Sequence, residues 1–227
     1  LRTRLDVVVS PEDDTELRRL TLVNRGLTTR EIEVTSYAEL VLAPLAADVA
    51  HPAFSKLFVV TEFVPGVEAL LATRRRRGDE EPEVWLAQVA LVEAGAAVGG
   101  LQVETDRARF LGRGRDARCP LALAGAQPLS GTTGAVLDPV FSLRRRLRLP
   151  PGASARVVFA TAAAGSREAA LALAEKCRGA GHMERTLALA WTRAQVQLRY
   201  LGVSPEEAQL FQQLAGSLLG SDARMRP

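Results

Sequence analysis

The residues best suited to hold a ligand are the four arginines and two glycines in the stretch TDRARFLGRGR, residues 105–115. A guanidinium group makes forked hydrogen bonds to sugar hydroxyls or to phosphate, and glycine allows the backbone to turn sharply and approach a ligand. Phe110 and Leu111 are expected to anchor this loop in the core. The alternative is an exposed hairpin tip with solvated arginines. The candidate binding residues here are Arg109, Gly112, Arg113, Gly114 and Arg115.

A second stretch, LSGTTGAV at residues 129–136, combines hydroxyl groups with glycines. Hydroxyl groups both donate and accept hydrogen bonds, which suits a loop that faces a sugar. The alternative is a plain flexible connection between strands. The candidate binding residues in this loop are Ser130, Thr132 and Thr133.

No catalytic constellation is recognisable in the sequence. The G-x-S-x-G motif is absent, and GRGR lacks the Lys-Ser/Thr pair of a phosphate-binding P-loop. The two cysteines and two histidines are isolated, so neither a metal site nor a cofactor is predicted. From these residues alone, we expect a binding or structural module without catalytic residues.

Composition narrows the range of partners. The 227 residues are 47% hydrophobic, which is enough to bury a core, and the net charge of +3 comes from arginines mixed with 26 acidic residues. Aromatic residues make up 5% of the chain, which disfavours extensive nucleobase stacking. No apolar run approaches the roughly 20 residues of a membrane helix. A nucleic-acid-binding protein acting through Arg74 to Arg77 and Arg144 to Arg148 is the weaker alternative, so neither nucleic acid nor membrane is an expected partner.

The first two thirds of the chain have the period of β-strands. In EIEVTSYAELVL, residues 31–42, apolar and polar residues alternate in one long predicted strand. Further alternating segments are separated by Pro, Gly and charged clusters, without helices between them. In FSLRRRLRL, Arg144, Arg146 and Arg148 are predicted on the face opposite to the leucines. The pattern predicts a mainly β fold, an antiparallel two-sheet sandwich over residues 1–163.

After about residue 163 the period becomes helical. Ser166 is expected to cap a first helix, and a second is predicted from about His182 to Leu201. SPEE, residues 204–207, has the spacing of a capping box at the start of a third helix. Trp191 lies on the apolar stripe of the second helix, so we expect it to pack against the sandwich.

Six blocks of the sequence together resemble a known family. They resemble the N-terminal β-sandwich and helical linker of glycoside hydrolase family 94, formerly glycosyltransferase family 36, and within it the C-terminal phosphorylase-like region of bacterial cyclic β-1,2-glucan synthases. The resemblance covers essentially the whole chain. The blocks are VSPEDDTELRRLTLVNRG, EVTSYAELVLAP, HPAFSKLFVVTEF, TDRARFLGRGR, LSGTTGAVLDPVFSLRRRLRLPPG and LALAWTRAQVQLRYLGVSPEEAQLFQQLA.

The resemblance implies a two-sheet super-sandwich at residues 1–163 and a short all-α linker at 164–227. A catalytic (α/α)6 barrel would follow, outside this chain. The implied reaction is inverting phosphorolysis of a β-glucoside to a glucose 1-phosphate, or its reverse, with a carboxylate of the barrel as general acid. The implied partners are a β-glucan oligosaccharide, phosphate, the barrel and a second subunit in a homodimer. The implied location is the cytoplasm, either free or as the cytoplasmic region of a larger inner-membrane protein.

For this chain alone, the resemblance implies a part in dimerisation and in one wall of the sugar site, without catalysis. The loop at residues 105–115 is the part expected to approach the active site of the neighbouring subunit. The alternative is a stand-alone carbohydrate-binding module. That alternative requires a groove lined by exposed aromatic residues, for which Trp85 and Tyr37 are the candidates.

Overall fold

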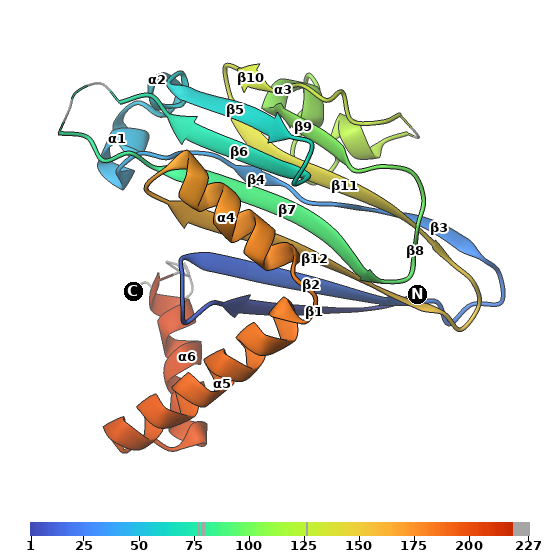
Figure 1. Cartoon of the computed structure of the whole chain (residues 1–227), viewed down its shortest axis with the longest axis vertical. Coiled ribbons are helices and arrows are strands. Elements are labelled where there is room, and N and C mark those ends of the chain that lie inside the picture. The colour runs from blue at the N-terminus through green and yellow to red at the C-terminus, as the bar shows by residue number, and fades with distance from the viewer. Residues whose placement is uncertain (77, 79, 126, 220–227) are drawn as a thin grey trace.

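The computed structural model describes residues 1–76, 78, 80–125 and 127–219. These residues form two antiparallel sheets that lie against each other, with helices at the C-terminal end (Figure 1). The antiparallel two-sheet super-sandwich predicted from the sequence is therefore confirmed. The last eight residues of the predicted linker, 220–227, lie outside the described residues.

In the described chain one sheet has seven strands and the other has five. The order of the larger sheet is β1 (Arg2–Val9), β2 (Thr15–Val23), β12 (Ser154–Ala164), β7 (Trp85–Ala94), β6 (Ala69–Arg74), β5 (Val59–Val64) and β10 (Gly134–Ala135). In the smaller sheet, β11 (Pro139–Leu149) pairs with β3 (Arg30–Thr35), β4 (Ala38–Glu39), β8 (Ala96–Ala97) and β9 (Gln102–Asp106). The helices are α1 (Leu45–Ala50), α2 (Pro52–Lys56), α3 (Arg107–Leu111), the 3-10 turn η1 (Leu121–Leu123), α4 (Arg167–Arg178), α5 (His182–Leu201) and α6 (Pro205–Leu219).

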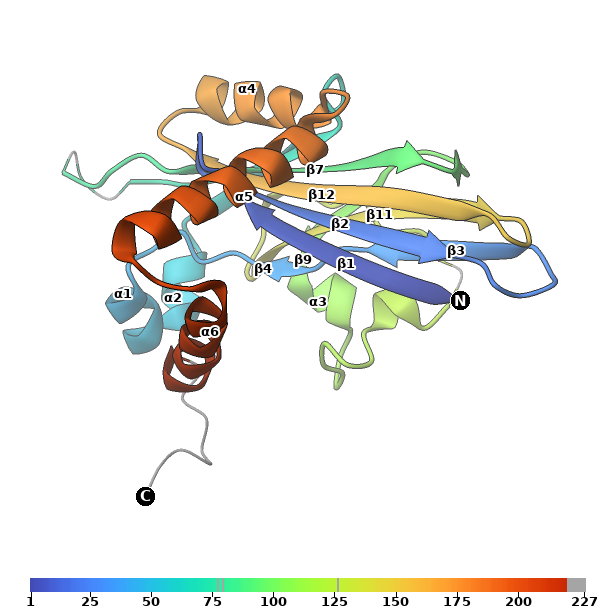
Figure 2. The same cartoon turned by 90° about the horizontal axis from the view of Figure 1, so that it is seen from below.

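Side chains along a strand point alternately to the two faces of the larger sheet, so its apolar residues form two layers of core. In β12, Val157 joins the core between the sheets, whereas Val158 joins the core beneath α4. Strand β6 is covered on both sides, and residues 69–72, ALLA, are all at most 1% exposed. A strand buried on both faces reads as a continuous apolar run. The seven-stranded sheet is thus the middle layer, with α4 on one face and the smaller sheet on the other (Figures 1 and 2).

The long strand predicted at residues 31–42 is broken in the structure. Strand β3 ends at Thr35 and the short β4 starts at Ala38. Between them the hydroxyl of Ser36 accepts a hydrogen bond from the backbone N–H of Leu143 at 2.9 Å, a role that a backbone carbonyl has in a regular ladder. The short helices α1, α2 and α3 also lie among the strands, where the sequence pattern predicted no helices.

The C-terminal helices begin where the sequence predicted them. The Ser166 hydroxyl accepts from the N–H of Ala169 at 3.1 Å and caps α4. At α6 the predicted capping box is complete, because Ser204 N–H donates to Glu207 at 2.8 Å and Glu207 N–H donates to Ser204 at 3.2 Å. The first of these bonds lowers the pKa of Glu207. No helix among the described residues has both the length and the hydrophobicity needed to cross a membrane.

The prediction that Trp191 packs on the sandwich is wrong. Its side chain is 68% exposed, although Met183, one of the first residues of α5, is 2% exposed. Helix α5 is buried only in its N-terminal half, where it contacts the sheet at β1, and its remainder extends past this edge of the sheet (Figure 1). The apolar stripe was identified correctly, but the sequence does not show where the supporting sheet ends.

Candidate functional site

The first candidate stretch, residues 105–115, consists of the end of β9, the helix α3 and a glycine turn. The Asp106 carboxylate caps α3 by accepting from the N–H groups of Ala108 and Arg109, at 2.8 and 3.4 Å. Arg109 therefore lies on a helical turn rather than on an open loop. Phe110 and Leu111 are 3% and 4% exposed, which confirms that they anchor the stretch in the core.

The two glycines of this stretch have left-handed backbone conformations, with φ of 81° at Gly112 and 70° at Gly114. Only glycine adopts these angles without strain. A Cβ atom added at Gly112 would lie 2.7 Å from the Cβ of Leu121. The close approach that Gly112 permits is therefore to the segment after the turn, not directly to a ligand.

The two candidate loops meet in one depression of about 580 Å³, which we call the arginine depression. Arg109, Phe110 and Arg115 line it from the first stretch, and Ser130 lines it from the second. Its other lining residues are Glu104, Leu121, Ala122, Ala124, Gly125, Gln127, Pro128 and Leu129. The candidates outside this set of described lining residues are Gly112, Arg113, Gly114, Thr132 and Thr133.

Ser130 is held in place by a buried carboxylate. Glu104 is 2% exposed, and one of its oxygens accepts from the backbone N–H groups of Thr105 and Asp106, at 3.0 and 2.9 Å. Its other oxygen accepts from both the N–H and the hydroxyl of Ser130. Because the Ser130 hydroxyl donates to Glu104, the Thr132 hydroxyl is the donor in the 2.7 Å contact between the two hydroxyls. The Ser130 hydroxyl is thus held between Glu104 and Thr132 at the wall of the depression.

A buried arginine supports another part of the wall. The sequence placed Arg144 on the face opposite to the leucines, with Arg146 and Arg148, and in the structure Arg144 is 0% exposed. Its guanidinium donates to the carbonyls of Ala122 and Gln127 and to the hydroxyl of Thr35, and Glu33 lies 3.4 Å away. Arg144 thereby ties both ends of the depression's wall to the sheet.

Sequence reasoning did not identify Glu104 and Arg144 as parts of the site. For Glu104 the available signal was an acid within a predicted strand, immediately before the arginine-rich stretch. For Arg144 the period-2 pattern gave the correct face of the strand. The residues that cover that face, Ala122 and Gln127, lie 22 and 17 residues before Arg144 in the chain, and no pattern within the strand indicates such a contact.

Both the ring and the hydroxyl of Tyr37 make contacts within the chain. Its ring stacks on Phe110 with centroids 4.8 Å apart, and its hydroxyl donates to Glu39 at 2.8 Å. Burial and that hydrogen bond raise the pKa of Tyr37 to about 12. Arg107 also donates to Glu39, at 2.9 Å, so it is engaged beside the depression rather than in it.

The structure gives little support to the alternative functions. Trp85 packs partly against the core under α4 and Tyr37 stacks on Phe110, so the described residues provide no exposed platform built from these two rings. The two basic runs considered for nucleic-acid binding are also partly occupied. Arg144 and Arg145 are buried, and Arg74 is paired with Glu81. Arg77 lies outside the described residues. Among the described residues, no cluster of His, Cys, Asp and Glu side chains is placed to hold a metal ion.

Comparison with known proteins identifies the family. A model of the glycosyl hydrolase 94 supersandwich domain matches residues 1–180, and the chain belongs to this family. The chain is also 40% identical over 226 residues to the cyclic beta-(1,2)-glucan synthase NdvB of Rhizobium meliloti (strain 1021). That match covers 100% of this chain and 8% of the relative, so the chain spans less than a tenth of that protein's length.

Proposed function

We propose that this chain is a non-catalytic super-sandwich with its helical linker, and that its arginine depression binds a β-linked glucose oligosaccharide. The observation that carries the proposal is that Arg109, Arg115 and Ser130, from two separate loops, line a single depression. The name of the relative, a cyclic beta-(1,2)-glucan synthase, supports β-1,2-linked glucose as the ligand to test first.

The chemistry of the depression suits a sugar. The guanidinium groups of Arg109 and Arg115 are donors without acceptor capacity, and the oriented oxygen of Ser130 is an acceptor. A sugar hydroxyl can accept a hydrogen bond from an arginine guanidinium while it donates one to the Ser130 oxygen. Leu121 and Leu129 supply apolar wall for the C–H groups of the ring. The two arginines outnumber the single carboxylate, Glu104, among the described lining residues, so inorganic phosphate is the second ligand to test.

In the whole enzyme, we propose, this chain forms one wall of the sugar site and contributes to a homodimer. The reaction would be inverting phosphorolysis of a β-glucan, or its reverse, catalysed by a cytoplasmic barrel that follows residues 164–227. Support comes from the apolar side chains that the linker helices leave uncovered within the described chain. Trp191 is 68% exposed, Tyr200 89%, Phe211 53% and Leu218 71%. Large apolar side chains left exposed on these helices are available for contact with another part of the enzyme.

The affinity of the 227-residue chain for linear β-1,2-linked gluco-oligosaccharides tests the proposal. Replacing Arg115 by Ala should weaken binding by about ten- to a hundredfold, because a hydrogen bond from a charged donor contributes on the order of 1.5–3 kcal/mol. Isothermal titration calorimetry measures the change, with inorganic phosphate titrated separately. Arg113→Ala is the matched control, since Arg113 is an exposed arginine on the same turn but outside the described lining set.

Arg113→Ala should change the affinity by less than about twofold. Equal losses in Arg113→Ala and Arg115→Ala would show general electrostatic attraction rather than a site. Unchanged affinity in Arg115→Ala would remove the arginine depression as the place where the oligosaccharide binds.

A further inference from the structure

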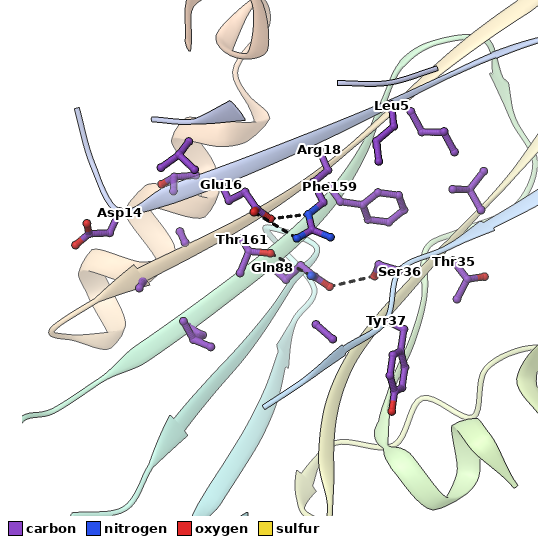
Figure 3. A pocket seen from close by; sticks show the side chains of 18 residues that line it. Leu5, Asp14, Glu16, Arg18, Thr35, Ser36, Tyr37, Gln88, Phe159 and Thr161 are labelled. Carbon is purple, nitrogen blue, oxygen red and sulfur yellow. Dashed lines mark hydrogen bonds and ion pairs between the residues drawn. The ribbon is translucent and has the colours of Figure 1, made fainter. Parts of the chain in front are cut away.

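A second, larger hollow lies between the two sheets and is separate from the arginine depression. This inter-sheet groove has a volume of about 720 Å³, within the range of small-molecule sites. It opens over β2, β12 and β7 of the larger sheet and is walled by the chain between β3 and β4. Figure 3 shows Glu16, Arg18, Phe159, Thr161 and Gln88 on one side of it, with Thr35, Ser36 and Tyr37 on the other.

The groove has an apolar floor. Leu20, Phe159 and Leu86 line it from three adjacent strands of the larger sheet, and Val34 lines it from β3. Phe159 is only partly buried, so part of its ring faces the groove. An accessible aromatic ring among aliphatic side chains suits the apolar C–H face of a sugar ring.

The polar groups of the groove are fixed in place. Gln88 is 4% exposed and joins the two sheets, because its side-chain oxygen accepts from the Ser36 hydroxyl and its nitrogen donates to the Thr161 hydroxyl, both at 3.1 Å. Thr161 therefore keeps its own O–H as a donor. The guanidinium of Arg18 meets the carboxylate of Glu16 in a two-pronged pair, at 2.6 and 3.3 Å.

The charges of the groove exclude an anionic ligand. The described lining residues include two carboxylates, Asp14 and Glu16, and a single arginine, Arg18, so the groove carries a net negative charge. A phosphate or an acidic headgroup would be repelled. The polar groups include donors and acceptors spaced along an apolar floor, which fits a neutral ligand that carries many hydroxyls.

We propose that the inter-sheet groove is a second carbohydrate site that binds a neutral segment of a β-linked glucose oligosaccharide. The inference takes its ligand class from the proposed function. The two sites share a wall, because Tyr37 lines the groove, Phe110 lines the arginine depression, and their rings stack. The groove therefore holds a different part of the glucan from the part held by Arg109 and Arg115.

The test uses Arg115→Ala, in which the arginine depression is weakened, so that the remaining affinity reports on the groove. Adding Arg18→Ala should lower the remaining affinity for a β-1,2-linked gluco-oligosaccharide at least about tenfold, since a charged hydrogen-bond donor is lost. Adding Thr161→Val, which keeps the shape but removes the hydroxyl, should weaken binding as well. The Arg18 side chain is 58% exposed, so the fold is retained, and thermal unfolding checks this.

Arg4→Ala is the matched control for Arg18→Ala. Arg4 pairs with Asp6 two residues along its strand, at 2.9 Å, as Arg18 pairs with Glu16. It lies on the opposite face of the same sheet, as its register partner Thr21 shows. We expect Arg4→Ala to leave the affinity within about twofold of its starting value.

The outcomes separate the two sites. If Arg115→Ala abolishes all binding, the proposal of a site in the arginine depression is supported and the proposal of a second site in the groove is overturned. If Arg115→Ala has no effect while Arg18→Ala and Thr161→Val weaken binding, the groove stands and the proposed site at Arg115 fails. Equal effects of Arg4→Ala and Arg18→Ala, or no binding by the unchanged chain, would overturn the groove.

Discussion

Replacing Arg144 by Met should lower the free energy of unfolding by about 2–4 kcal/mol, because two backbone carbonyls lose hydrogen bonds from a buried charged donor. Methionine retains much of the side-chain volume, so the loss reports on polar contacts rather than on a cavity. The substitution removes the donors to Ala122 and Gln127 and the partner of Glu33. Urea unfolding measures the change. Because both ends of the depression's wall lose their anchor, affinity for the oligosaccharide should fall too.

Arg146→Met is the control for this substitution. Arg146 lies on the same face of β11, but its side chain is 43% exposed and pairs with Glu31 and Glu33 at the surface. Exposed ion pairs contribute little, so the change should stay within about 1 kcal/mol. If the two variants are equally stable, Arg144 does not hold the wall of the arginine depression.

Replacing Asn24 by Ala should destabilise the sandwich by about 2–4 kcal/mol, because buried hydrogen-bonding groups lose their partners. Asn24 is 0% exposed. Its side-chain nitrogen donates to the carbonyls of Thr28, Leu149 and Pro150, at 2.8, 2.9 and 3.1 Å, and its oxygen accepts from Gly26 at 3.0 Å. One side chain thus joins the turn after β2 to the turn between β11 and β12.

Asn24→Asp separates the acceptor role of this side chain from its donor role. It keeps the oxygen that faces Gly26 but places a carboxylate against three carbonyls, so we expect it to be no more stable than Asn24→Ala. Gln197→Ala, at an exposed position of α5, should leave stability nearly unchanged. Full stability of Asn24→Asp would mean that the donated bonds do not hold the two turns together.

The elements of the fold that rest on local patterns were predictable. Alternation indicated the sheets, because side chains in strands point to alternate faces. Ser166 and the Ser204–Glu207 capping box mark helix starts because they satisfy N–H groups that the helix leaves free. Nothing local showed that Asn24, in the turn after β2, is buried.

The features that sequence reasoning missed depend on contacts between distant segments. Trp191 is exposed because α5 extends past the edge of the sheet. The sequence of the helix does not show where that edge lies. The break at Ser36 depends on Leu143, which is far along the chain. The residue types of the candidate site were predictable, and Arg109, Arg115 and Ser130 do lie together. That these residues lie close together could not be predicted from local patterns. It depends on the register of β9 and β11, which brings the two loops to one edge of the sheet.

The amide NMR spectrum of the 227-residue chain, recorded with increasing β-1,2-linked gluco-oligosaccharide, tests the central claim most directly. We expect saturable shifts at the amides of Arg109, Arg115 and Ser130, because these residues line one depression. Arg115→Ala should greatly reduce these shifts. Saturable shifts confined to other parts of the chain, or none at all at concentrations that saturate the calorimetric signal, would contradict a carbohydrate site at the arginine depression.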